Sequence, residues 1–207
     1  MDEVELQLQS PLLQIMRSRR SIRRYHPDSV SRAVVENLLE AAGWAPSAHN
    51  RQPWRFVVVE SDDVKTKLAD AMGARLRQDL AQDGASADVI EADAARSVRR
   101  LSSAPILIVV CLTMTDMDVY PDRRRSELEH RMAVQSAAMA GQNLLLAAHD
   151  AGLGACWMCA PLFCPDAVSD VLQLPADWQP QGLITLGYPA ESREKTRRPP
   201  GEITLWR

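Results

Sequence analysis

The chain lacks the features that place a protein in several common classes. No stretch approaches the ~20 continuous apolar residues that span a bilayer. The formal net charge of −3 over 207 residues provides no overall field that would recruit nucleic acid or an anionic membrane. The sequence has no Gly-x-Gly-x-x-Gly, no phosphate-binding Walker loop and no internal repeat. We therefore expect no nucleic-acid and no membrane partner, and any basic patch should serve a small anion.

Cysteine is scarce, and the few cysteines do not suggest a disulfide framework. The four cysteines are Cys111, Cys156, Cys159 and Cys164. The start of the chain, residues 1–6, is acidic and has no basic-then-apolar secretion pattern. We expect a cytoplasmic protein whose cysteines are free thiols.

The composition and the alternation of patterns predict one α+β domain over residues 1–207. Hydrophobic residues make up 46% and charged residues 25%, which is typical of a globular chain with a substantial core. Expected helices cover residues 11–19, 31–42, 127–151 and 166–172, with Ser31 as an N-cap and Gly152 ending the long helix. Expected strands cover residues 55–60, 105–112, 155–158 and 182–188, the second being central.

Residues 62–100 are helical in character and highly charged, with an interruption near residues 84–86. Because Arg, Asp and Glu alternate along it, the segment is expected to be a solvated helical excursion rather than a core element. It would act either as a lid or as a plain surface pair of helices.

Three polar segments far apart in the chain suit a single ligand. Residues 19–24 and 195–198 concentrate cations, and Ser21 adds a hydroxyl. Arginine binds phosphate through a planar fork, and hydroxyls occupy the remaining acceptor positions. Between them in sequence, Asn50 and Gln52 lie two apart, so in an extended loop both amides could address the edge of one heterocycle. The alternative is a turn whose amides bond to their own backbone.

The order of these motifs resembles the flavin-dependent nitroreductase family over nearly the whole chain. The resemblance rests on Arg-Arg-Ser-Ile-Arg-Arg-Tyr at 19–25, Ala-Pro-Ser-Ala-His-Asn-Arg-Gln-Pro-Trp at 45–54, Gly-Leu-Gly-Ala-Cys-Trp at 152–157, Gly-Tyr-Pro at 187–189 and Lys-x-Arg-x-Pro at 195–199. It implies a central mixed sheet flanked by helices, a homodimer, and FMN at the subunit interface.

The resemblance also implies roles for individual residues. Arg19, Arg20, Ser21 and Arg23 would contact the phosphate, ribityl chain and pyrimidine end of the flavin. Pro46, Ser47, Ala48 and Asn50, with Gln52 beside them, would reach the flavin of the partner subunit. Lys195, Arg197 and Arg198 would close on the phosphate, and the backbone near Met158 and Cys159 would face flavin N5.

The implied activity is ping-pong hydride transfer from NADH or NADPH to a small organic acceptor such as a nitroaromatic or a quinone. No side-chain acid or base is required, so no catalytic residue and no metal ligand is named. Ala48 stands where many members have a hydroxyl, and the basic or amide residue that members contribute from mid-chain has no clear counterpart.

Other interpretations stay open. A narrower similarity links Arg77–Leu80, Glu129-His130 and residues 174–180 to the FMN-binding domain of the deazaflavin-coenzyme glutamyl ligases, which leaves a reductase of that pathway as an alternative. A non-catalytic flavin-binding sensor or carrier is a second alternative. A metal held by Cys156, Cys159 and Cys164, with Cys111 or His149, is a third.

Overall fold

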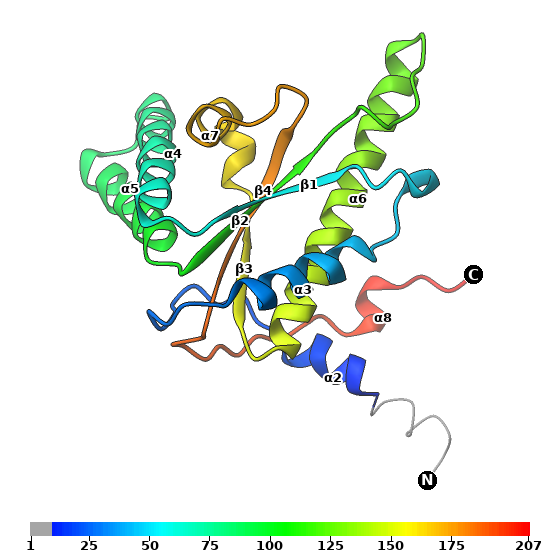
Figure 1. Cartoon of the computed structure of the whole chain (residues 1–207), viewed down its shortest axis with the longest axis horizontal. Coiled ribbons are helices and arrows are strands. Elements are labelled where there is room, and N and C mark those ends of the chain that lie inside the picture. Colours follow the sequence, from blue (N-terminus) through cyan, green and yellow to red (C-terminus); the bar gives the residue numbers. More distant parts are fainter. Residues whose placement is uncertain (1–9) are drawn as a thin grey trace.

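The computed structural model describes residues 10–207, and residues 1–6, on which the absence of a secretion signal was argued, lie outside them. Four strands form one sheet: β1 (Trp54–Val59), β2 (Ile106–Leu112), β3 (Gly154–Met158) and β4 (Gln179–Gly187). The helices are α2 (Pro11–Ser18), α3 (Arg32–Gly43), α4 (Asp62–Gln82), α5 (Ala87–Ser102), α6 (Arg123–Asp150), α7 (Pro165–Leu172) and α8 (Pro200–Ile203) (Figure 1). Two 3₁₀ turns, η1 (Ala48–Asn50) and η2 (Ala160–Phe163), complete the set.

Strand β2 lies at the centre of the fold, as its continuous apolar run predicts. The strand order is β1-β2-β4-β3, and every residue of β2 is buried. Its side chains alternate between two cores, as the period of two in a strand requires. Ile106, Ile108 and Val110 pack in the core formed with α3 and α6, and Leu107 and Val109 pack in the core formed with α4 and α7. Helices therefore cover both faces of the sheet (Figure 1).

The expected α+β class is confirmed, and the pairing of the sheet is more regular than expected. All three strand pairs are antiparallel, so the mixed character is confined to one parallel bridge between Ser21 and Ala155. The expected elements are all present, with Ser31 as N-cap of α3. Helix α6 begins four residues earlier than predicted, because Asp122 caps it by accepting a hydrogen bond from the Arg125 N–H at 3.0 Å.

The expectation that residues 62–100 stay outside the core is wrong. The segment does form two helices broken near Gly84, but Leu68, Ala69 and Met72 of α4 are buried against β2 and α7. Lys65 is also buried, and its Nζ donates to the carbonyls of Ala104 and Pro105, each at 3.0 Å. The charged residues conceal an apolar stripe that the composition of the segment does not reveal. Among the described residues no helix has the length and apolarity to cross a membrane.

The indole ring of Trp157 on β3 is wedged between α6 and β4. Gly141 faces it from α6 and Gly182 from β4, and a Cβ at either position would overlap the ring carbons. The chain approaches the ring closely on both sides because neither residue has a side chain. The absence of a side chain at Gly141 thus leaves room on α6 for the indole ring of Trp157.

We expect Gly141→Ala to lower the free energy of unfolding by about 1–3 kcal/mol, because the added methyl overpacks the contact with Trp157. The matched control is Gly43→Ala, at a helical position where a Cβ meets nothing within 4 Å. Urea unfolding followed by circular dichroism measures both. Equal free energies of unfolding for the two variants would contradict the close packing of Trp157 against Gly141.

Candidate functional site

The chain that leaves α2 runs along the free edge of β3 and is held there by backbone contacts. The Ile22 N–H donates to the Ala155 carbonyl at 3.1 Å, and Tyr25 bridges to Pro189. A Cβ on Gly154 would lie 2.8 Å from the Ile22 side chain, so glycine is needed there. Arg19, Arg20 and Arg23 flank the two residues that pair with β3, so their positions relative to this strand are fixed.

The first group joins three cations, Arg19, Arg20 and Arg197, with the imidazole of His149. Arg19 Nη1 and Arg20 Nε are buried and have no hydrogen-bond partner within the described residues. Burial lowers the pKa of Arg19, and the neighbouring charges of Arg197 and Arg20 lower it further. Buried N–H groups of charged side chains cost free energy unless an acceptor meets them. This arrangement fits a bound anion, and we call these four residues the phosphate cluster.

His149 was named before only as a possible ligand of the alternative metal site, and the structure places it in this cluster. Its Nε2 shares a hydrogen bond of 2.7 Å with the Ser18 hydroxyl. Burial lowers the pKa of His149, and the charges of Arg19 and Arg20 lower it further. The imidazole is therefore kept neutral beside the two arginines. His149 is 131 residues from Ser18 in the sequence, so no sequence motif indicated this contact.

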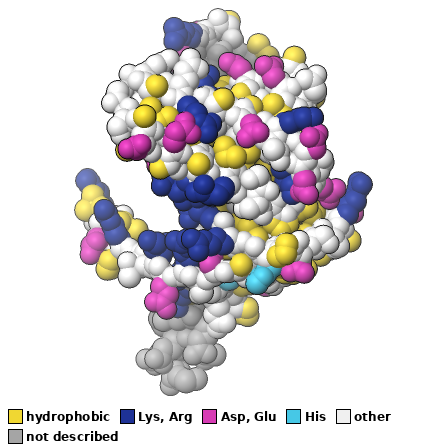
Figure 2. All heavy atoms as spheres, turned by 90° about the vertical axis from the view of Figure 1, so that its left-hand side faces the viewer, with side chains coloured by type: hydrophobic (Ala, Val, Ile, Leu, Met, Phe, Trp, Pro, Cys, Tyr) yellow, Lys and Arg dark blue, Asp and Glu magenta, His cyan; other side chains and the backbone are white. Residues whose placement is uncertain are grey.

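A second group of arginines lines a hollow of about 330 Å³ on the neighbouring surface. The lining residues, which we call the arginine pocket, are Arg23, Arg24, Arg96, Arg99, Arg100, Ser103 and Arg193. Figure 2 shows Lys and Arg side chains gathered along a hollow on this face. Of the predicted residues only Arg23 belongs to it, and α5 supplies three others.

Arginines of both cation groups act electrostatically on Cys156, which lies on β3. Burial raises the pKa of its thiol, whereas the charges of Arg23, Arg100 and Arg19 and the hydrogen bond of Ser21 oppose that rise. The pKa of one thiol is therefore lowered, against the effect of burial, by an arginine of the phosphate cluster and by arginines of the arginine pocket. Both groups act on the same stretch of β3, which ends at the predicted backbone position Met158 and Cys159.

The loop of residues 46–52 is a strained turn and not the extended loop that was expected. His49, Asn50 and Gln52 all have positive φ, at 49°, 55° and 49°. The Gln52 N–H donates to Ser47 Oγ at 3.0 Å, and the Ala48 N–H donates to Ser136 Oγ at 3.3 Å. Three left-handed residues in so short a turn store free energy, which is common at functional sites.

The amides of this loop bond within the turn, as the alternative interpretation of these residues held. Gln52 Nε2 donates to Asn50 Oδ1 at 3.3 Å and reaches the Asn50 carbonyl at 3.5 Å. Within residues 10–207, the loop is joined to α6 by the hydrogen bond to Ser136. It is joined to the segment before α6 by the ion pair between Arg51 and Asp118. No contact that the structure records joins the loop to the phosphate cluster of the same chain.

The C-terminal cations are only partly brought to the site. The charge of Arg197 acts on Arg19, and its Nη1 donates to the Thr196 carbonyl at 3.0 Å. Lys195 and Arg198 are exposed and make no recorded ion pair in the described part of the chain. Their assignment to a phosphate stays a prediction.

The cysteine-metal alternative finds no support in residues 10–207. There, no three His, Cys, Asp or Glu side chains gather to hold a metal ion. Cys164 donates to the Ala160 carbonyl at 3.4 Å, and Cys159 Sγ accepts from Trp157 Nε1 at 3.2 Å. Burial raises the pKa of Cys111 to about 12.

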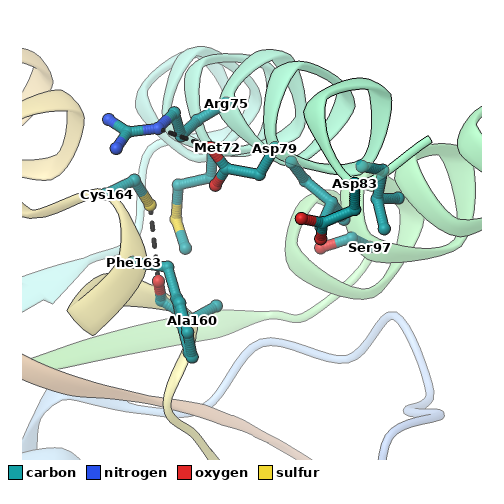
Figure 3. A pocket seen from close by; sticks show the side chains of 10 residues that line it. Met72, Arg75, Asp79, Asp83, Ser97, Ala160, Phe163 and Cys164 are labelled. Atoms are coloured by element: carbon teal, nitrogen blue, oxygen red, sulfur yellow. Dashed lines mark hydrogen bonds and ion pairs between the residues drawn. The ribbon is translucent and has the colours of Figure 1, made fainter. Parts of the chain in front are cut away.

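A separate cavity of about 270 Å³ lies between α4, α5 and η2 (Figure 3). Its walls combine Met72 and Phe163 with the Arg75–Asp79 ion pair, and Cys164 closes one end. It shares no residue with the phosphate cluster or the arginine pocket. We therefore keep it apart from the candidate site.

Helix α5 carries three basic residues that were not predicted as site residues. Arg96, Arg99 and Arg100 have spacings of three and four, so they share one helical face. This spacing could have indicated a basic face on the helix. The acidic residues of the same segment hid it, because they made the segment's composition typical of a solvent-exposed helix.

Comparison with known proteins finds relatives that match most of the chain. The model of the "Nitroreductase family" matches residues 16–188. A protein of Thermus thermophilus named NADH dehydrogenase is 33% identical, with 91% of this chain and 92% of that protein covered. A structure from Desulfovibrio desulfuricans, described as a nitroreductase in complex with FMN, has 32% identity and a TM-score of 0.73, covering 96% and 98% of the two chains. A BluB-like flavoprotein from Clostridium difficile has 25% identity and a TM-score of 0.79, covering 95% and 99%.

The chain belongs to the nitroreductase family. The resemblance drawn from the motifs, and the nitroreductase-like fold that it implied, are confirmed. The narrower similarity to the deazaflavin-coenzyme ligases stays a prediction.

The burial pattern predicts one reactive thiol. Cys159 is exposed, whereas Cys111, Cys156 and Cys164 are buried. We expect a chromogenic disulfide reagent to label one thiol per native chain quickly and all four in denaturant. Cys159→Ser should abolish the fast phase, and fast labelling of a second thiol would contradict the assigned burial.

The lowered pKa of His149 predicts a pH dependence of stability. The folded chain binds fewer protons here than the unfolded chain, whose histidine titrates near 6.5. Stability from this group is therefore complete well above that pH and decreases as the pH falls through it. We expect the melting temperature of His149→Gln to fall less than that of the parent between about pH 7.5 and 5.5. Parallel pH profiles would show that His149 makes no such contribution.

Proposed function

We propose that the chain is an FMN-dependent oxidoreductase that passes hydride from NADH or NADPH to a small organic acceptor, such as a nitroaromatic or a quinone. The observation that carries this proposal is that one buried guanidinium nitrogen of Arg19 and one of Arg20 have no hydrogen-bond partner among residues 10–207. Support also comes from the relative in complex with FMN and from the relative named NADH dehydrogenase.

The residues present fit the phosphate of FMN. Arg19 Nη1 and Arg20 Nε are donors that find no acceptor in the described part of the chain, and Arg197 adds a third guanidinium. A phosphate offers acceptor oxygens to such donors and gains charge-assisted hydrogen bonds, which are the stronger kind. Ser21, which follows on the same edge of β3, would bind the ribityl chain. Lys195 and Arg198 would approach the phosphate from the C-terminal segment.

From this anchor the flavin ring would extend along β3. Arg23 would then meet its pyrimidine end, and the backbone at Met158 and Cys159 would face its central ring. When bound, FMN supplies the hydride chemistry, and the protein supplies position and charge. A cation near the pyrimidine end favours the anionic reduced flavin, which is the role we assign to Arg23.

A second copy of the chain would complete the site. Pro46, Ser47, Ala48, Asn50 and Gln52 lie on a turn that has no recorded contact with the phosphate cluster of its own chain. Its left-handed residues hold polar groups in a fixed arrangement. We propose that this turn addresses the flavin bound by the partner of a homodimer.

We expect the purified protein to show the two-banded visible spectrum of a flavin and to release FMN on denaturation. Arg19→Ala and Arg197→Ala should each raise the dissociation constant of FMN about 10- to 100-fold, because each removes a charge-assisted hydrogen bond of about 1.5–3 kcal/mol. The spectrum and fluorescence titration of the apoprotein measure this.

The control is Arg32→Ala, which removes an exposed guanidinium on α3 that pairs with Glu36. It should bind FMN as the parent does. A colourless protein that also fails to bind added FMN would overturn the proposal. Binding of FMN without turnover of either nicotinamide would favour a sensor or carrier over an enzyme.

A further inference from the structure

The arginine pocket gathers guanidinium groups from three segments that are distant in sequence. Arg23 and Arg24 come from the strand-like segment beside β3, and Arg193 comes from the segment after β4. Arg96, Arg99 and Arg100 come from the end of α5, where Ser103 follows them. The favourable helix dipole accounts for cations in the last turn of α5, but not for the arginines that face them from elsewhere.

Acidic side chains neutralise only part of this charge. Asp93 pairs with Arg96 at 2.5 Å, and Glu191 pairs with Arg193 at 2.7 Å. Arg23, Arg24, Arg99 and Arg100 make no ion pair among the described residues. Burial lowers the pKa of Arg100, and the charges of Arg23, Arg96 and Arg193 lower it further. Like charges held this close favour a bound counter-anion.

One FMN cannot satisfy both cation groups. Its single phosphate would occupy the phosphate cluster, where Arg19 Nη1 and Arg20 Nε have no partner from residues 10–207. Arg23 would be used at the pyrimidine end of the ring, which leaves Arg24, Arg99 and Arg100 without an anion. Arg23 and Arg24 of the pocket directly follow Ser21 and Ile22, which pair with Ala155 of β3, and Arg19 and Arg20 of the phosphate cluster directly precede them, so both cation groups flank the same part of β3. A second ligand in the pocket would therefore lie next to the flavin.

We propose that the arginine pocket binds an anionic group, phosphate or carboxylate, of the small molecule that exchanges hydride with the flavin. The group belongs either to the donor, as the additional phosphate that NADPH has and NADH lacks, or to an acidic acceptor. This inference rests on the proposed function and makes the pocket its specificity determinant.

The test compares matched pairs of substrates that differ in one anionic group. The donor pair is NADPH and NADH, and the acceptor pair, measured with NADH, is para-nitrobenzoate and nitrobenzene. The variant is Arg99→Ala/Arg100→Ala, which keeps good helix formers on α5 and removes no residue assigned to FMN. Arg32→Ala is again the control.

We expect the parent to prefer the anionic member of one pair by at least about tenfold in kcat/KM, since two or more charge-assisted contacts are involved. The double variant should reduce that preference to near unity and leave kcat/KM for the other member within about twofold. A preference within the donor pair assigns the pocket to NADPH, and one within the acceptor pair assigns it to an acidic acceptor. The control should keep the preference of the parent.

Calorimetric titration of the oxidised holoprotein with inorganic pyrophosphate gives a readout independent of turnover. Binding should be at least about tenfold weaker in the double variant. The inference would be overturned if the parent showed no preference in either pair. It would also be overturned if the double variant changed neither the preference nor the affinity for pyrophosphate. Loss of FMN from the parent would instead overturn the proposed function, so the two failures are distinguishable by the flavin spectrum.

Discussion

The candidate site depends on the pairing of residues 21–25 with the edge of β3. The bridge from Ser21 to Ala155 and the hydrogen bond from the Ile22 N–H fix this segment at one end. At the other, the Tyr25 hydroxyl lies 2.7 Å from Thr185 Oγ1, and burial raises the pKa of Tyr25. Gly154 permits the close approach. Without this pairing, Arg19, Arg20 and Arg23 would have no defined position relative to one another.

The same pairing places like charges beside one another, and the rest of the fold must hold them there. The antiparallel sheet and its two apolar cores supply that support, since β2 is buried along its whole length. Mutual repulsion of the cations is a cost in the ligand-free state that a bound anion removes. Binding of the anion and stability of the fold are thereby linked, which is expected of a site built on an otherwise rigid scaffold.

Much of the fold could be predicted from the sequence, because it depends on local patterns. The apolar run of β2, the N-cap Ser31 and Gly152 with φ of 75° each define an element by short-range chemistry. The motif that contains Arg19, Ser21 and Arg23 likewise marked the segment that pairs with the edge of β3. The positive φ of His49, Asn50 and Gln52 could not be predicted, because it depends on contacts with Ser47 and α6.

Segment 62–100 shows why composition alone misled. Its charge suggested a solvated excursion, yet α4 buries Leu68, Ala69 and Met72 and thereby becomes a layer of the core. Because α4 is anchored and packs closely with α5, the arginines on α5 are held by a rigid element. An arginine on a loosely attached lid would lose conformational entropy on binding an anion, whereas one on a packed helix has already lost much of it. The packing of α4 is therefore what makes the arginine pocket a pre-organised surface, and it connects the core of the fold to substrate choice at the proposed flavin.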